Sequence, residues 1–446
     1  MQKISGFLVL AALLGACSHG EQPATRPNII LIMADDLGYE CMGCYGGVSH
    51  ATPNLDALAE GGMRFSYAYS QPLCTNTRTE LMTGKYLHHN WVAFGILDPA
   101  EKTFGHLMKD QDYATCIVGK WQLQSYDPPG YPGSELRRGI GMHPGDAGFD
   151  EYCLYHTGHT EDKGSRYADP HILQNGEFLE NTVGKYGPDI FTAYLNDFAS
   201  RNREKPFFIY YPMALTHGPF VPTPDSEDWQ DESMRHTQDT AYFGDMVRYC
   251  DKIVGKIVGN LEDLGLDENT LILFYSDNGT HQELYSTMNG QRIKGGKGLT
   301  TDAGIRVPMI ASWKGTIPSG ILSDELVYSC DFLPTILEAA GSAVPVGFKC
   351  DGESFLSILQ GKEAKRRDWI YTDFNPLPGW DKDQFEVERY VMDRDYKLYE
   401  DGRFYRWSED PLEIHPLDAA FLDEDLLQLK KKFQHILDSI PASAQN

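Results

Sequence analysis

The 446-residue sequence is poor in basic residues and has no internal repeats or low-complexity tracts. With 39 basic against 64 acidic residues, its formal net charge is −25. The chain therefore lacks the basic excess that nucleic acids and anionic membranes attract, and we predict no nucleic-acid partner. If the substrate is a polyanion, only local cations can hold it. The content of hydrophobic residues, 41%, is ordinary for a globular enzyme.

The apolar run at the N-terminus, from Ile4 to Leu14, is too short to span a bilayer. It follows Lys3 and has the layout of a secretory signal. Small residues precede Cys17 in Leu-Gly-Ala-Cys, which resembles a bacterial lipobox. We therefore expect a signal peptide over 1–16, lipidation of Cys17 and a tether over 17–26. The protein would then be exported and anchored to a bacterial membrane, in the periplasm or at the cell surface; the alternative is a plain signal peptide cut nearby.

The nine cysteines form no regular disulfide framework. Setting aside Cys17 and Cys74, which are discussed separately, leaves an odd number. Cys41 and Cys44 have the spacing Cys-x-x-Cys, but no second pair follows to complete a zinc site. We interpret these two cysteines as packing residues or, at most, as one local disulfide.

Two apolar segments each end in a pair of oxygen ligands. Residues 28–34 lead into Asp35 and Asp36, and residues 271–276 lead into Asp277 and Asn278. Continuous apolar runs of this length are typical of strands buried on both faces, and open α/β sheets bind ligands at the carboxyl ends of such strands. Neither pair has a histidine or cysteine beside it, which favours calcium or magnesium over zinc. Three carboxylates and one amide oxygen predict a calcium site.

The hydrophobic pattern predicts an α/β fold with a large, mostly parallel or mixed central sheet flanked by helices. Residues 113–119 and 206–211 are further buried-strand candidates, and an apolar stripe over 246–264 predicts a long helix. From Lys365 onward, short alternating segments and a helix over about 422–440 predict a small antiparallel α+β subdomain. Because the chain exceeds the usual size of a single core, we expect a catalytic domain over 27–364 and a C-terminal subdomain over 365–446.

Cys74 precedes Arg78 by four residues at the start of a short predicted helix. The helix dipole and a nearby guanidinium favour a reactive, anion-facing group there. An isolated Cys-x-x-x-Arg is most often a half-buried cysteine in a loop. Here, however, the stretch continues through Leu81 to Thr83-Gly84-Lys85. It resembles the signature of the type I sulfatases of the alkaline phosphatase superfamily, C-x-(P/A/S)-x-R followed by x-x-L-x-T-G-(K/R); Asn76 stands where that family most often has Pro or Ala.

Three later blocks extend the resemblance over nearly the whole mature chain. Gly-Lys-Trp at Lys120 matches the second sulfatase signature, with Gln122 at the position of a family histidine. A glutamine can donate a hydrogen bond but cannot shuttle a proton at neutral pH, so its role must be to orient. His217 stands after a predicted strand in the sequence His-Gly-Pro, where the family has its leaving-group acid. Lys297 begins a block that resembles the segment carrying the second sulfate-binding lysine.

The resemblance implies an alkaline-phosphatase-like fold and formylglycine chemistry. Cys74 would be converted to formylglycine (3-oxoalanine) by a formylglycine-generating, sulfatase-maturing enzyme, and its hydrate would be the nucleophile. One calcium ion would be held by Asp35, Asp36, Cys74, Asp277 and Asn278. The catalytic residues implied in this way are Cys74, Arg78, Lys120, Gln122, His217 and Lys297.

Residues 125–170, rich in Pro, Gly, Tyr and His, are expected to form long loops over the carboxyl edge of the sheet and to influence substrate choice. The candidate anion contacts in this region are Arg137, Arg138, His143, His156, His159 and Arg166. An exported lipoprotein fits a sulfated poly- or oligosaccharide substrate, and we predict a sulfuric ester hydrolase, arylsulfatase-like. Two alternatives stay open. One is a phosphate or phosphonate ester hydrolase on the same fold; the other, raised by Asn76 and Gln122, is an inactive glycan-binding lipoprotein.

Overall fold

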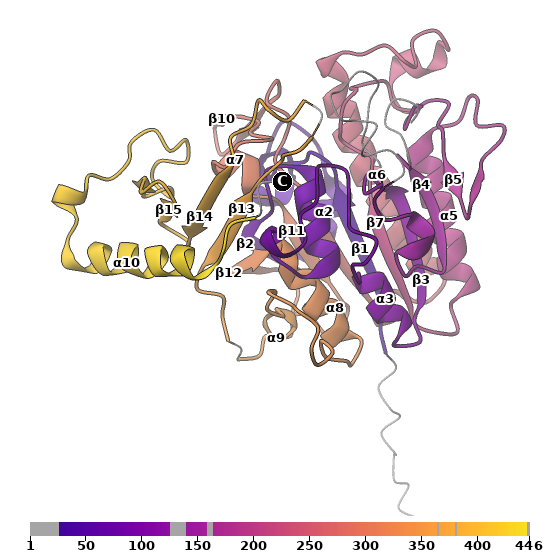
Figure 1. Cartoon of the computed structure of the whole chain (residues 1–446). Coiled ribbons are helices and arrows are strands. Elements are labelled where there is room, and N and C mark those ends of the chain that lie inside the picture. Colours follow the sequence, from indigo (N-terminus) through magenta and orange to yellow (C-terminus); the bar gives the residue numbers. More distant parts are fainter. Residues whose placement is uncertain (1–25, 125–139, 158–163, 364, 380, 444–446) are drawn as a thin grey trace, which may run out of the picture.

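The computed structural model describes residues 26–124, 140–157, 164–363, 365–379 and 381–443 (Figure 1). The predicted signal peptide and Cys17 lie outside the described residues, as do Arg137, Arg138 and His159. Within the described part of the chain, no helix combines the length and the apolar character that crossing a membrane requires.

A mixed ten-stranded sheet forms the centre of the molecule, in the order β12-β2-β11-β8-β1-β7-β3-β4-β5-β6. Strands β8, β1, β7, β3 and β4 run parallel, whereas β11 is antiparallel to both β8 and β2. The strands are β1 (Asn28–Ala34), β2 (Met63–Tyr69), β3 (Ala114–Lys120), β4 (Glu151–Tyr155), β5 (Leu173–Gln174), β6 (Glu177–Phe178), β7 (Phe207–Pro212), β8 (Thr270–Ser276), β11 (Met309–Ser312) and β12 (Ile321–Tyr328). A separate hairpin pairs β9 (Tyr285–Met288) with β10 (Gln291–Lys294).

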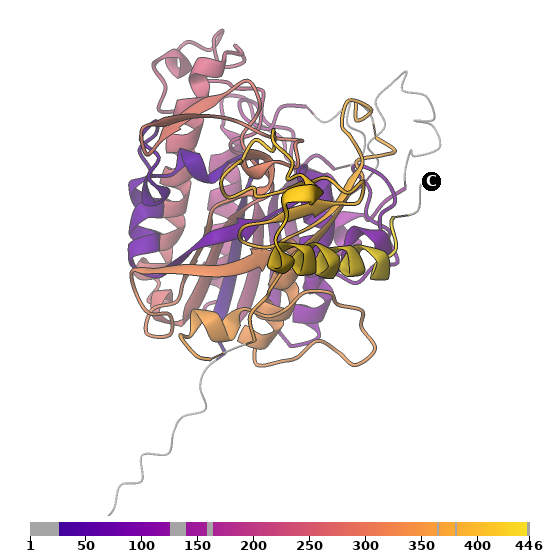
Figure 2. The same cartoon turned by 90° about the vertical axis from the view of Figure 1, so that its left-hand side faces the viewer.

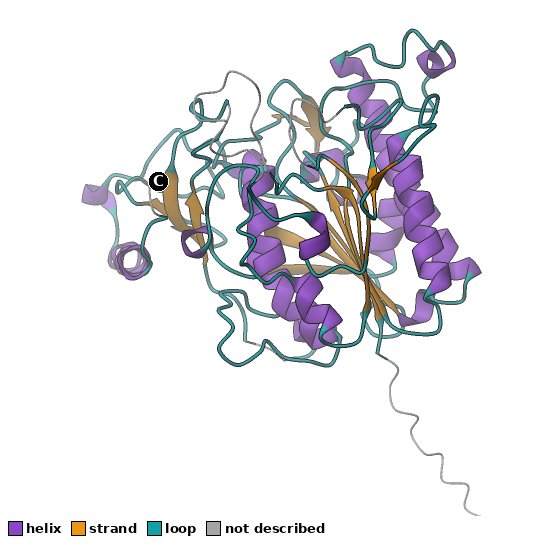
Figure 3. Ribbon diagram, turned by 45° about the vertical axis from the view of Figure 1, so that its right-hand side comes forward, coloured by secondary structure: helices purple, strands orange, loops and turns teal. Residues whose placement is uncertain are grey.

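Helices cover both faces of this sheet (Figure 3). One face packs against α1 (Pro53–Glu60), α5 (Gly187–Arg201) and α6 (Phe243–Asp263). The other packs against α2 (Cys74–Thr83), α3 (Phe104–Lys109), α8 (Phe332–Ala339) and α9 (Leu356–Leu359). Because side chains alternate along a strand, Ile30 and Ile32 of β1 join the first core, and Ile29, Leu31 and Met33 join the second. This two-sided burial explains the continuous apolar run of β1.

The C-terminal part forms a four-stranded antiparallel sheet covered by a helix, which Figure 2 shows in the foreground. Its elements are β13 (Ile370–Phe374), β14 (Glu388–Met392), β15 (Lys397–Tyr399), β16 (Phe404–Tyr405) and α10 (Glu424–Ser439). Its core is continuous with side chains of β2 and β12, including Tyr69 and Tyr328. The predicted fold class, with its small C-terminal antiparallel subdomain, is confirmed.

Two details differ from or refine the sequence-based expectations. The segment 125–170 was expected to form loops, yet it contains β4, a strand parallel to β3. This strand is only five residues long and lies between Gly-rich stretches, so its pattern is too short to stand out.

Among the described residues every cysteine is a free thiol. Cys41 is buried, with its sulfur 3.4 Å from the hydroxyl oxygens of Thr280 and Ser286, which favours the packing interpretation over a local disulfide.

Candidate active site

The two predicted oxygen-ligand pairs meet because β1 and β8 are neighbouring parallel strands. Ala34 lies opposite Ser276 in their register, so the residues that follow each strand emerge side by side. The backbone N–H of Asp36 donates to Asp277 Oδ1 at 3.1 Å, and Asn278 Nδ2 donates to Asp36 Oδ1 at 2.8 Å. All four predicted ligands, Asp35 included, are at most 1% exposed. The structure therefore brings the predicted quartet together at the carboxyl edge of the sheet.

Three cations pair with these three carboxylates; Arg78 and Lys120 are buried, and the side chain of Lys297 is 15% exposed. Lys120, the last residue of β3, places its Nζ 2.8 Å from Asp35 Oδ2. Lys297 Nζ lies 2.6 Å from Asp36 Oδ2. Arg78, on the second turn of α2, donates from Nη2 to Asp277 Oδ2 at 3.0 Å and from Nη1 to the carbonyl of Lys120 at 3.1 Å. Alternating charges hold this edge of the sheet together.

Cys74 is the first residue of α2, so the positive end of the helix dipole faces the site. Its thiol is 2% exposed and donates to Gln122 Oε1 at 3.1 Å. The sulfur and one carboxylate oxygen each of Asp35 and Asp277 all lie within 4.8 Å of one another. Residue 74 thus stands among the carboxylates, and Gln122 is positioned to orient its side chain.

His217 follows β7 and is placed by backbone contacts with β1. The N–H of Asp35 donates to the carbonyl of Leu215, and the N–H of Thr216 donates to the carbonyl of Asp35. The Nε2 atom of His217 lies 3.8 Å from Asp36 Oδ2, and its Nδ1 lies 2.6 Å from the carbonyl of Gly218. Burial and the charges of Lys297, Lys120 and Arg166 hold the pKa of His217 well below its ordinary value.

The pKa values of two carboxylates of the site, Asp35 and Asp277, are shifted in opposite directions. Burial and the negative charge of Asp35 raise the pKa of Asp277 above its ordinary value. For Asp35 itself burial also acts upward, but the charges of Lys120 and Arg78 outweigh it and lower the pKa. A further positive charge close to Asp277 would relieve this repulsion.

The residues present fit a hard divalent cation. Two buried oxygens, Asp35 Oδ1 and Asn278 Oδ1, have no hydrogen-bond partner among the residues that the structure describes. An unsatisfied buried oxygen costs free energy, and a metal ion satisfies it. Carboxylate and amide oxygens are ligands that calcium prefers, whereas a thiol suits it poorly. A residue 74 that carried oxygen in place of sulfur would fit such an ion better.

The loop candidates for anion contacts are dispersed. His143 is exposed, and its imidazole accepts a hydrogen bond from the N–H of Gly145. His156 is buried, and its backbone carbonyl accepts from the N–H of Gln122. Arg166 is buried, with its guanidinium 4.8 Å from the ring centroid of Tyr155, and its charge acts on His217 and Asp35. Of these three, Arg166 is the candidate that lies beside the charged cluster with a cationic side chain.

One cation near the site was missed from the sequence. Lys382 belongs to the connection between β13 and β14, and its Nζ lies 4.5 Å from the ring centroid of Phe94. Phe94 packs in one small cluster with Leu73 and Cys74. Burial and the charges of Lys297 and Lys120 lower the pKa of Lys382. No motif surrounds this lysine, so no sequence signal could have assigned it to the site.

Comparison with known proteins adds independent information. A family model described as sulfatase matches residues 27–342, and one described as N-sulphoglucosamine sulphohydrolase, C-terminal, matches residues 296–440. The chain is 31% identical over 431 residues to N-acetylgalactosamine-6-sulfatase of Canis lupus familiaris, which covers 89% of this chain and 77% of that protein. It is also 31% identical over 387 residues to arylsulfatase A of Homo sapiens, which covers 81% and 73% of the two chains.

Among solved structures, the fold is similar to that of Ps i-CgsB in complex with k-i-k-neocarrahexaose. The TM-score is 0.73 at 25% sequence identity, and the match covers 93% of this chain and 92% of that one.

Proposed function

The chain belongs to the sulfatase family of sulfuric ester hydrolases, and we propose that it removes sulfate from a sulfated poly- or oligosaccharide. The observation that carries the reaction type is that Arg78, Lys120 and Lys297 pair with the carboxylates clustered around Cys74, at the start of α2. The carbohydrate is supported by similarity to an N-acetylgalactosamine-6-sulfatase and to a protein solved with a neocarrahexaose.

The nucleophile in this proposal is residue 74 after a maturation enzyme has converted its thiol to formylglycine. A hydroxyl of the hydrated aldehyde attacks sulfur, and the bond between sulfur and the sugar oxygen breaks. Loss of the proton of the second hydroxyl would then re-form the aldehyde and expel sulfate, and water would restore the hydrate. Gln122, which accepts from the Cys74 thiol at 3.1 Å, would orient that side chain. Its amide neither gains nor loses a proton near neutral pH, so it positions the nucleophile without acting as a base.

The sulfate would be bound by N–H donors of Lys120, Lys297 and Arg78 that do not contact a carboxylate. Lys120 and Lys297 each have three N–H donors, and each makes one carboxylate contact. The Nε–H of Arg78 is buried and has no partner among the described residues. Bound to Asp35, Asp36, Asp277, Asn278 and residue 74, a calcium ion would add positive charge that favours the ionised nucleophile.

His217 would protonate the departing sugar oxygen. With Nδ1–H donating to the carbonyl of Gly218, the other ring nitrogen, Nε2, is directed toward the site. Because neighbouring cations lower the pKa of His217, an anionic substrate that screens those cations favours its protonated form. The acid would then be charged mainly when substrate is bound.

The test compares esters of two tetrahedral anions in the presence of calcium. We expect turnover of an aryl sulfate and of a sulfated saccharide, with little turnover of the matching aryl phosphate. Mass spectrometry of the tryptic peptide that ends at Arg78 should show formylglycine at position 74 in the same batch. Preferential turnover of the phosphate, or full activity with an unmodified thiol, would contradict the proposal.

We also propose that the protein is anchored to a bacterial membrane through lipidated Cys17, on the sequence pattern alone. Cys17→Ser should move the protein from the membrane fraction to the soluble fraction without changing its specific activity. A wild-type protein that is already soluble would contradict the anchor.

A further inference from the structure

A cavity of about 430 Å³ adjoins His217, and none of the described residues that line it is acidic. Its lining includes Arg166, Arg235, His217 and His236, together with uncharged residues. In a chain with 64 acidic and 39 basic residues, this composition is unusual. Clefts lined by charge of one sign concentrate ligands of the opposite sign.

Arg166 is a buried cation in the lining of this cavity. It is 5% exposed, and its Nη1 has no hydrogen-bond partner within the described part of the chain. The guanidinium is held against Tyr155 by ring contact and a side-chain hydrogen bond. Within the described ranges, no carboxylate lies at ion-pair distance from it. The described residues thus leave this buried guanidinium without an ion-pair partner, and a ligand that supplies an anion would lower the cost of burying its charge.

Arg235 is a second cation of the same lining, held by uncharged groups. Its guanidinium carbon lies 4.9 Å from the ring centroid of Trp229, and its Nε donates to the carbonyl of that residue at 2.9 Å. Its acidic neighbour, Glu232, is 3.7 Å away and 86% exposed, so solvent screens the pair. Arg235 is therefore held at the cavity by its contacts with Trp229, although the charge of Asp169, which pairs with His236, also acts on it.

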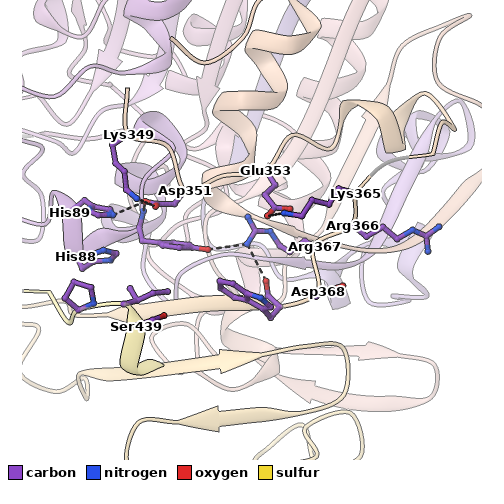
Figure 4. Close-up of a pocket in the computed structure, with 14 residues that line it drawn as sticks. His88, His89, Lys349, Asp351, Glu353, Lys365, Arg366, Arg367, Asp368 and Ser439 are labelled. Carbon is purple, nitrogen blue, oxygen red and sulfur yellow. Dashed lines mark hydrogen bonds and ion pairs between the residues drawn. The ribbon is translucent and has the colours of Figure 1, made fainter. Parts of the chain in front are cut away.

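A second cavity of the protein is lined by cations that pair with acidic residues of the same lining. This cavity, of about 510 Å³, lies between the end of α2 and the C-terminal sheet (Figure 4). Here Lys349 pairs with Asp351 at 2.7 Å and Lys365 pairs with Glu353 at 2.8 Å. In the cavity beside His217, His236 pairs with Asp169 at 2.8 Å, whereas among the described residues Arg166 has no ion-pair partner and the one beside Arg235, Glu232, is exposed.

We propose that the cavity beside His217 is a subsite for a second anionic group of the substrate, a sulfate or a carboxylate, bound by Arg166 and Arg235. The inference rests on the proposed function, in which His217 protonates the departing sugar oxygen. The leaving saccharide must then extend past His217, and His217 also lines this cavity. The volume is within the range of ordinary small-molecule sites.

The experiment measures kcat/KM for three saccharides that share one sulfate ester: a monosulfated form, a disulfated form, and a form that carries a uronate carboxylate. We expect the wild type to prefer at least one doubly anionic form. Arg235→Gln and Arg166→Lys should each reduce that preference by about 10- to 100-fold, as expected for loss of a charged hydrogen bond. Arg366→Gln, near the other cavity, is the matched control and should leave the preference unchanged.

The uronate arm and the disulfate arm separate the two sources of negative charge. A wild type that turns over all three saccharides equally, or a preference unchanged in both arginine variants, would overturn the subsite. If no saccharide is cleaved, the proposed function fails, and inhibition of aryl sulfate turnover then tests the subsite directly. Stronger inhibition by the doubly anionic saccharides, weakened in Arg235→Gln, would support it; equal inhibition by all three would overturn it.

Discussion

Two buried charge clusters of this protein differ in how completely their polar atoms are satisfied. In the cluster beside the C-terminal sheet, Asp331 receives hydrogen bonds from Arg367, from the N–H of Tyr328 and from the N–H of Glu353. Both of its oxygens therefore have partners. In the candidate active site, three buried atoms have no partner in the described ranges: Asp35 Oδ1, Asn278 Oδ1 and Arg78 Nε.

The difference separates a structural role from a functional one. A satisfied pair such as Asp331 and Arg367 links segments of the chain and has no capacity left for a ligand. Each unsatisfied buried group costs about 1–3 kcal/mol, and a ligand that provides its partner recovers this cost. The incomplete cluster thus has buried polar atoms to which a cation and an anion could bind, whereas the oxygens of Asp331 in the complete one already have partners.

The largest expected effect comes from removing the nucleophile. Cys74→Ala should lower kcat by roughly 10⁴- to 10⁶-fold, the scale seen when a nucleophile is removed. Substrate should still bind, since Arg78, Lys120 and Lys297 remain. Cys350→Ala, which removes a free thiol near the other cavity, is the control and should keep its activity. Undiminished turnover in Cys74→Ala would move the nucleophile elsewhere.

The next prediction tests whether calcium binds to the buried oxygens that have no hydrogen-bond partner among the described residues. Wild-type protein should gain about 2.7 kcal/mol of unfolding free energy at a calcium concentration 100 times the dissociation constant. Asp277→Asn should lose activity and most of this gain. Without calcium the variant should be at least as stable as the wild type, because it removes a buried charge beside Asp35. Melting temperatures that are equal for the wild type with calcium and with chelator would exclude a tightly held ion.

Breaking the complete cluster should affect stability alone. Arg367→Ala leaves Asp331 buried without its counter-charge and should cost about 3–5 kcal/mol, with or without calcium. Urea unfolding measures this loss. Arg366→Ala, whose side chain is 69% exposed, should change the unfolding free energy by less than about 0.5 kcal/mol. A calcium-dependent loss in Arg367→Ala would mean that the two clusters are coupled.

The smallest effect is a pH dependence near the second cavity. Burial and the charge of His89 lower the pKa of His88 to about 4. Between about pH 6.5 and 4 the unfolded chain binds the extra proton, so this contribution is intact above pH 6.5 and is lost as the pH falls. Because His88 is half-exposed, solvent screening limits the change to about 1 kcal/mol or less.

His88→Gln should flatten this part of the stability profile, measured by urea unfolding at pH 7 and pH 5. The exposed His143 provides the control substitution, His143→Gln. Identical profiles for wild type and His88→Gln would show that this imidazole does not contribute.

Several residues of the site could be predicted from the local sequence because their motifs lie at the end of a strand or at the start of a helix. Asp35 and Asp277 could be placed on neighbouring strand ends because buried parallel strands have continuous apolar runs. The fold class could be predicted in the same way, although β4 could not. Arg166 could be named only as one of several loop candidates, since a loop has no periodicity that fixes where its side chains lie.

By itself, the sequence determined the strand-end carboxylates, the cysteine at the start of α2 and the order of the motifs. These depend on short-range patterns, namely apolar periodicity and residue spacing. Only the tertiary structure decided which cations lie beside the site and which of the described cations pair with acidic residues elsewhere. It also joined Asn76 to the C-terminal segment, through a hydrogen bond to the carbonyl of Asn375, and brought Lys382 near Cys74. Such pairings join residues about 300 positions apart, and no local preference of the chain encodes them.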